Sequence, residues 1–213
     1  MAIVKNNRGR GRPRAFDHDS VLERAMQVFW AAGYEAASIP MLTDAMGISA
    51  QSLYAAFGSK DALYRDAIDY YSRTVGGFAA RALDEEPDAI KAVTRLLREA
   101  AINFARTTGT PGCMITTAPA EVAETPLTLL GRELRAESVR RVAARLKRGI
   151  DERQLSNDFN YEEWARYIGS VVQGMSVQAR DGAPVDALLS IAEIAAQSTE
   201  AHRLRSARRR RPR

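Results

Sequence analysis

Residues 38–60 read SIPMLTDAMGISAQSLYAAFGSK, and this stretch decides how the chain begins to fold. Ser38, Ser49 and Ser59 each precede a run with helical spacing, and a serine oxygen accepts the free N–H groups of a first helical turn. Gly47 and Gly58 follow the first two runs, at positions where glycine commonly ends a helix. The pattern predicts a short helix between Ser38 and Gly47, a second near 50–57, and a longer helix after Ser59.

A further helix is expected upstream of this stretch. It starts at Asp17, whose carboxylate can accept first-turn N–H groups, and ends at Gly33. Its apolar residues Leu22, Ala25, Met26 and Phe29 share one face. Two helices joined by a turn that contains glycine are typical of the DNA-binding helix-turn-helix. The sequence therefore predicts such a motif near 38–57.

The helix near 50–57 has the outer face that a DNA major groove requires, because its side chains are small or polar and none is acidic. Gln51 can form paired hydrogen bonds with an adenine edge, and the Tyr54 hydroxyl can donate to a phosphate. Ser38, Ser49 and Lys60 lie at helix N-termini, which attract phosphate. The predicted DNA contacts in this region are Ser38, Ser49, Ala50, Gln51, Ser52, Tyr54 and Lys60.

Charge is concentrated at the two ends of the chain. The net charge is +5, residues 1–14 carry five basic residues and no acid, and residues 203–213 carry seven arginines. The expected recognition helix has no basic residue, although DNA affinity depends largely on Lys and Arg. The N-terminal arm can supply that charge through Arg10, Arg12 and Arg14, whose small neighbours suit a narrow minor groove. The C-terminal arginines fit a polyanion-binding arm and a solvated tail equally well.

The rest of the chain reads as helix, since apolar residues recur at three and four and no stretch alternates as a strand does. The expected helices lie near 88–106, 113–123, 126–149, 161–180 and 184–201. We therefore expect an all-α protein with a basic flexible arm (1–15), a three-helix helix-turn-helix domain (16–60), a C-terminal helical bundle (61–202) and an Arg-rich tail (203–213).

The segment from Phe16 to about Tyr70 resembles the DNA-binding domain of the TetR/AcrR family of bacterial regulators. The resemblance rests on Val28-Phe29, Gly33-Tyr34, Ser38-Ile39, Ala45-Met46-Gly47-Ile48-Ser49, Ser52-Leu53-Tyr54, Phe57-Gly58-Ser59-Lys60 and Leu63. It implies DNA contacts at Ser38, Ser49, Gln51, Tyr54 and Lys60. It also implies that the domain 61–202 binds a small effector and dimerises through its last two long helices. Ala55-Ala56 and Pro40 depart from the family pattern.

Candidate residues in the C-terminal domain follow from this resemblance and from helical spacing. The effector-pocket candidates, which are equally suited to a helical core, are Phe104, Cys113, Met114, Trp164, Tyr167 and Met175. The dimerisation candidates are Trp164, Ile168, Val171, Val172, Met175, Leu188, Leu189, Ile191, Ala192 and Ala195. Gly112-Cys113-Met114 resembles a segment of a family subgroup in which some members sense electrophiles or oxidants. A small buried residue is the favoured reading of Cys113, because no basic cluster surrounds it.

Other classes of function find little support. One cysteine and two histidines argue against a disulfide and a zinc site, and we expect no metal and no cofactor. The sequence has no Gly-rich phosphate loop, no His-Glu-x-x-His and no nucleophile elbow, so we expect no enzyme. No apolar run suits a bilayer crossing or a signal peptide, which predicts a soluble cytoplasmic protein without a membrane partner.

Two hypotheses remain. The first is a homodimeric, sequence-specific repressor that binds a palindrome in double-stranded DNA and responds to a small-molecule effector. An activator with the same DNA-binding mode is the alternative within this hypothesis. The second is an architectural or nonspecific DNA-binding protein that uses its two basic tails.

Overall fold

The computed structural model describes residues 17–106, 108–119 and 124–204. Its elements are α1 (His18–Ala36), α2 (Ile39–Met46), α3 (Ala50–Phe57), α4 (Lys60–Arg73), the 3-10 helix η1 (Val75–Gly77), α5 (Phe78–Glu85), α6 (Ala89–Phe104), α7 (Pro126–Asp151), α8 (Tyr161–Arg180) and α9 (Val185–Glu200). Extended pairing in the described ranges is limited to one isolated bridge between Leu155 and Arg203. The expected all-α class is confirmed.

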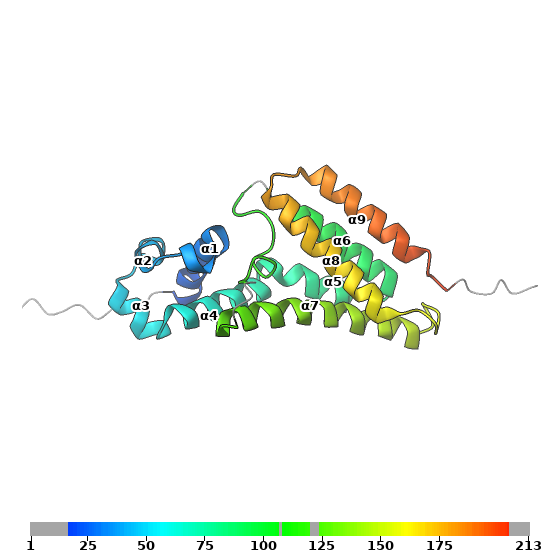
Figure 1. Ribbon diagram of the computed structural model, residues 1–213, viewed down its shortest axis with the longest axis horizontal. Helices are drawn as coiled ribbons and strands as arrows, with labels where there is room; N and C mark the ends of the chain where they lie inside the picture. The colour runs from blue at the N-terminus through cyan, green and yellow to red at the C-terminus, as the bar shows by residue number, and fades with distance from the viewer. Residues whose placement is uncertain (1–16, 107, 120–123, 205–213) are drawn as a thin grey trace, which may run out of the picture.

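The molecule is elongated, and its two ends are built differently (Figure 1). Helices α1–α3 gather at one end, while α5, α6, α8 and α9 form a bundle at the other. Helices α4 and α7 run along one edge and link the two ends. None of the described helices has both the length and the apolar character that a bilayer crossing requires.

Helices α2 and α3 begin and end where local sequence signals predict, and α4 begins where they predict. The hydroxyls of Ser38, Ser49 and Ser59 accept hydrogen bonds from the amides of Met41, Ser52 and Ala62, at 3.3, 3.1 and 3.0 Å. Each serine thereby satisfies a first-turn N–H that has no partner within its helix. Gly47 ends α2 with φ 69°, a left-handed conformation that glycine adopts without strain.

Helix α1 begins where the sequence predicts, but its cap and its C-terminal end differ from the prediction. Asp17 occupies the N-cap position, but its carboxylate makes no capping hydrogen bond. Gly33 has φ 80° and breaks the helix as expected, yet a further turn follows before the helix ends at Ala36. The glycine therefore produces a kink and not a simple end, which redirects Tyr34 toward α4.

One helix predicted for the C-terminal part is wrong. The helix expected near 113–123 does not form in its described part, where residues 114–117 are turns. The backbone conformation there is set by contacts with residues far away in sequence. The Cys113 amide donates to the Ser176 hydroxyl at 2.8 Å, and Met114 is buried against the N-terminal helices. The longer helix expected after Ser59 forms as α4, which ends at Arg73 and is followed by η1 and α5.

Apolar residues form two clusters that meet at Cys113. The N-terminal cluster joins the buried faces of α1–α4 to Met114, Ala118 and Leu127. The C-terminal cluster joins α5–α9. The N-terminal cluster extends along α4 to Tyr71, so this packing unit continues past the boundary at residue 60 that the sequence suggested.

Candidate nucleic-acid interface and cavity

Helix α3 presents a polar face to solvent and is anchored by its apolar one. Leu53 and Phe57 are buried in the N-terminal cluster. Ala50 and Gln51 are exposed, and 48% of Tyr54 is accessible. The structure thus brings the residues predicted for base contact onto one open surface.

The serines on this surface support one another. The hydroxyls of Ser49 and Ser52 are 2.9 Å apart and share a hydrogen bond, while Ser49 also caps α3. Ser38 is exposed at the start of α2, so the N-termini of both helices of the motif are open to an anion. The predicted contacts Arg10, Arg12 and Arg14 lie outside the described residues.

Lys60 begins α4 beside two other side chains. Its Nζ lies 4.2 Å from the centroid of the Tyr34 ring. The Tyr34 hydroxyl donates a hydrogen bond to the Asp61 carboxylate. Burial and this carboxylate raise the pKa of Tyr34, so the phenol keeps its proton. Sequence reasoning missed Tyr34 and Asp61, because helical spacing carries no signal for a contact between α1 and α4.

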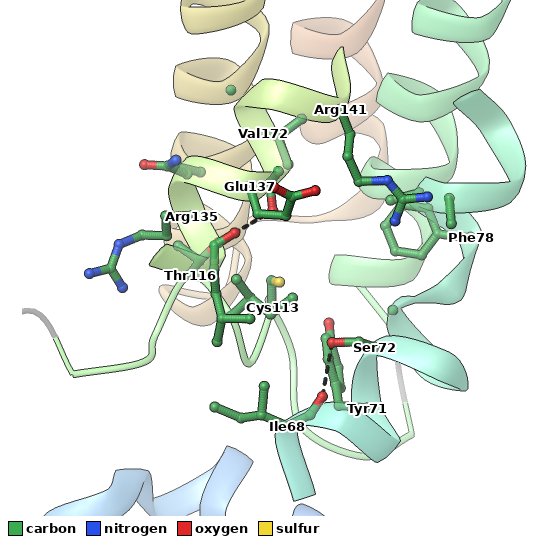
Figure 2. Close-up of a pocket in the computed structure, with 18 of the residues that line it drawn as sticks. Ile68, Tyr71, Ser72, Phe78, Cys113, Thr116, Arg135, Glu137, Arg141 and Val172 are labelled. Atoms are coloured by element: carbon green, nitrogen blue, oxygen red, sulfur yellow. Dashed lines mark hydrogen bonds between the residues drawn. The ribbon is translucent and has the colours of Figure 1, made fainter. Parts of the chain in front are cut away.

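A cavity of about 420 Å³ lies in the C-terminal domain, between α4, α5, α7 and α8 (Figure 2). Its wall is mainly apolar and includes Ile68, Tyr71, Phe78, Leu83, Leu96, Phe104, Ile115, Leu134, Val142, Ile168 and Val172. Arg141 and Glu137 lie at its edge, and Arg141 is paired with Asp84 at 3.2 Å. A cavity with this lining fits a small apolar molecule that carries few polar groups.

The structure separates the six residues predicted for the effector pocket. Phe104 and Cys113 line the cavity. Met114 is buried in the N-terminal cluster, and Met175 is buried in the C-terminal cluster. Trp164 and Tyr167 are not part of the wall; their rings contact each other with centroids 5.4 Å apart.

Comparison with known proteins decides the family. The model of bacterial regulatory proteins of the tetR family matches residues 21–67. The chain is 31% identical to the HTH-type transcriptional repressor ComR of Escherichia coli (strain K12), over 87% of this chain and 90% of ComR. It is 27% identical to the repressor BdcR of the same strain, over 93% of this chain and 96% of BdcR. This chain belongs to the TetR family.

A solved structure agrees with this conclusion. A cysteine-substituted form of the TetR family regulator CifR, complexed with 26-bp double-strand operator DNA, superposes with a TM-score of 0.80. The two sequences are 42% identical, and the match covers 88% of this chain and 99% of CifR. The TetR-family chain described here is therefore a sequence-specific DNA-binding transcriptional regulator.

In this TetR-family regulator the predicted dimerisation residues divide into two groups. Ile168, Met175, Leu188, Ala192 and Ala195 are buried in the chain's own core and cannot form a surface. Trp164, Val171, Val172, Leu189 and Ile191 are partly buried against that core. The exposed apolar residues of α8 and α9 are instead Tyr167, Val177, Val185 and Ile194, the last with 64% of its surface accessible.

A short loop joins the cavity of this TetR-family chain to its N-terminal helices. Cys113, Ile115 and Thr116 line the cavity, whereas Met114, between them, is buried in the N-terminal cluster. Figure 2 shows Cys113 and Thr116 on this loop, opposite Tyr71 and Ser72 of α4. The loop is therefore part of the cavity wall and of the N-terminal cluster at once.

A second connection comes from the end of α8. Arg180 Nη2 donates to the carbonyl oxygens of Trp30 and Ala31, at 3.2 and 3.3 Å. The kink at Gly33 deprives these carbonyls of their usual helical donors, so a cation there also complements the end of the helix. The Trp30 ring contacts Tyr71 edge-on, with centroids 5.0 Å apart, so Trp30 lies at the junction of the two domains.

Proposed function

We propose that this regulator is a homodimeric repressor that leaves a palindromic operator when a small apolar compound occupies its cavity. The observation that carries the proposal is the loop at residues 113–116, which forms part of the cavity wall and of the N-terminal cluster at once. The similarity to the repressors ComR and BdcR and to operator-bound CifR supports it. Its place of action is the bacterial cytoplasm, where the chromosome lies.

The proposed DNA contacts are of two kinds. Gln51 reads a base edge, with Ala50 and Ser52 beside it in the groove. Ser38, Ser49, Tyr54 and Lys60 bind phosphates at helix N-termini and at the groove edge. Because α3 has no basic residue, the arginines of the N-terminal arm supply much of the remaining affinity.

Two copies of the chain are needed to read a palindrome. A dimer sets two recognition helices in successive major grooves, about 34–36 Å apart. The outward face of α8 offers Tyr167, Ser170, Gly174 and Val177 at helical spacing, and Ile194 of α9 is exposed nearby in the bundle. A Cβ at Gly174 would meet nothing within 4 Å in one chain, so this face has room for a closely packed partner helix.

The effector acts through a population shift. A compound that binds the cavity more tightly in one arrangement of the domains shifts the population toward that arrangement. The shift in free energy cannot exceed the difference between the binding free energies of the compound for the two arrangements. The 113–116 loop and the Arg180 contact make the position of α1 depend on the arrangement around the cavity. Release from DNA follows when the favoured arrangement no longer matches the groove spacing.

The test is a selection of genomic fragments with purified full-length protein at physiological salt, followed by anisotropy titration of the enriched sequences. Recovery of one or a few palindromic sites is expected, and Gln51→Ala is expected to relax the preference at one base pair of each half-site. Enrichment that follows only A·T content, with affinity lost steeply as salt rises, would overturn the proposal in favour of binding through the basic tails.

A further inference from the structure

The start of α4 combines a favourable and an unfavourable feature for DNA. Its N-terminus offers free N–H groups, a helix dipole and the Lys60 ammonium, all of which attract phosphate. Asp61 in the same turn carries a negative charge that repels phosphate. Whether this turn binds DNA well therefore depends on where the two charged side chains are held.

Tyr34 contacts both of these side chains. Its ring lies under Lys60 Nζ at 4.2 Å, within the range of a cation–π contact. Its hydroxyl donates to the Asp61 carboxylate, which occupies a lone pair and directs the acid toward the protein. The two contacts use different parts of one side chain, so they can be separated by substitution.

Tyr34 itself is held firmly. Its ring stacks near Phe29 and meets Tyr64 edge-on, with centroids 6.2 and 5.1 Å away. Gly33, with φ 80°, turns the backbone so that the residue after it leaves the axis of α1. Because burial and Asp61 raise the pKa of Tyr34, its hydroxyl remains a donor across the physiological pH range.

We propose that Tyr34 is a positioning residue for the phosphate contact of α4: it steadies the Lys60 ammonium and holds the Asp61 carboxylate away from DNA. The inference rests on the proposed contact between Lys60 and phosphate, but not on a palindrome, a repressor or an effector. It assigns a DNA-binding role to a residue that touches no DNA. It also explains how an acid is accommodated in a turn that must face a polyanion.

A double-mutant cycle separates this role from a merely structural one. The variants are Tyr34→Phe, Asp61→Asn and the combination, each titrated by anisotropy against a 26-bp duplex of arbitrary sequence at low salt, a length taken from the CifR operator. Binding of such a duplex depends on phosphate contacts. Tyr34→Phe is expected to weaken binding about five-fold with Asp61 present, and to have no effect in the Asp61→Asn background.

The ring is tested through salt dependence. Tyr34→Leu removes the cation–π contact with Lys60. In a plot of log affinity against log salt concentration, the slope for Tyr34→Leu is expected to be shallower than wild type by about one unit per subunit. The same change in slope is expected for Lys60→Met, which removes the ammonium itself. Tyr34→Phe keeps the ring and is expected to retain the wild-type slope. Tyr70→Phe, which removes a phenol hydroxyl on α4 itself, is the matched control and is expected to bind as wild type.

Equal losses from Tyr34→Phe in both Asp61 backgrounds would overturn the inference, because the hydroxyl would then act on folding alone. Melting temperatures of all variants identify such a loss directly. A selection that yields no palindrome would refute the proposed function while leaving this cycle interpretable. A palindrome together with an additive cycle would refute only the role of Tyr34.

Discussion

The two apolar clusters differ in what they enclose. The N-terminal cluster is packed around aromatic rings, with Phe29 and Tyr64 in edge contact at 5.0 Å, and its short helices are capped by their own serines. The C-terminal cluster borders a cavity of about 420 Å³, and the N-terminal cluster reaches this cavity only at its far end, through Ile68 and Tyr71. A filled cluster holds one geometry, as reading DNA requires, whereas a cluster beside an empty space can repack around a ligand.

The largest expected effect is on the filled cluster. Phe29 is only 2% accessible, and Phe29→Ala is expected to lower the free energy of unfolding by about 3–5 kcal/mol because it leaves a cavity among rings. DNA binding is expected to disappear with it. Chemical denaturation followed by circular dichroism measures the first effect, and anisotropy the second.

The counterpart substitution adds volume at the cavity. Val172→Phe on α8 is expected to leave the free energy of unfolding unchanged or raise it by about 1 kcal/mol, since the new ring enters existing space. DNA binding is expected to persist, while fluorescence of 1-anilinonaphthalene-8-sulfonate, a dye with apolar rings and an anionic sulfonate, is expected to fall. A loss of stability as large as that of Phe29→Ala would show that the two clusters are equally well packed.

The next effect concerns the outward face of α8. Gly174→Leu adds a bulky side chain where one chain has open space, so the monomer is expected to fold normally. A second chain cannot approach as closely, and light scattering is expected to show monomers. Affinity for the operator is expected to fall by at least about 100-fold, since both half-sites must be held together.

The control is Ala144→Leu, which places the same leucine side chain at an exposed position of α7. It is expected to remain dimeric and to bind as wild type. A dimeric Gly174→Leu with unchanged affinity would place the dimer interface elsewhere on the chain.

A smaller effect is expected at the connection between the clusters. Arg180→Met removes two hydrogen bonds to α1 carbonyls, each with a charged donor, and is expected to cost about 1–2 kcal/mol. The N-terminal helices are then expected to unfold before the bundle, so calorimetry should resolve two transitions in place of one. Arg166→Met, at an exposed position of the same helix, serves as the control, and a single transition in both variants would argue against the connection.

The same contrast explains which predictions the sequence supports. Helices α2 and α3 were predictable because their signals are local: a serine at each start and a glycine at each end. The 113–118 loop was not, because its conformation depends on Ser176 and on a cluster built from α1 and α4. Only the folded chain brings those groups together.

Residue roles in the C-terminal domain were harder to predict than its helices. Spacing shows that Ile168 and Met175 share the apolar face of α8, but not whether that face meets the chain's own core or a second chain. The core takes the larger aliphatic side chains, and Gly174 and Ser170 remain on the outward side. A stripe of small residues carries little hydrophobic signal, although it is what close helix packing requires.

The tail boundary shows the same limit. Arg203 was assigned to the Arg-rich tail from composition, yet its guanidinium bonds to Asp88 and Glu200 at the end of the bundle. Charge counts do not distinguish a solvated arginine from one with a carboxylate partner far away in sequence. Residues 205–213 of the tail lie outside the described part of the chain, and so does the N-terminal arm.

This ion pair gives the smallest expected effect, and one that depends on pH. The Arg203 guanidinium lowers the pKa of Asp88, which also caps α6 by accepting from the amides of Ile90 and Lys91 at 3.0 and 2.9 Å. Because the folded pKa lies below the unfolded value of about 3.9, the stabilisation is complete above about pH 4 and is lost as pH falls through the folded pKa.

Asp88→Asn keeps a side chain that caps helices well but removes the ion pair. It is expected to cost about 0.5–1 kcal/mol at pH 7 and to differ progressively less from wild type below pH 4. Thermal melts of both proteins across that range measure the difference, and a gap that stayed constant with pH would contradict the lowered pKa of Asp88.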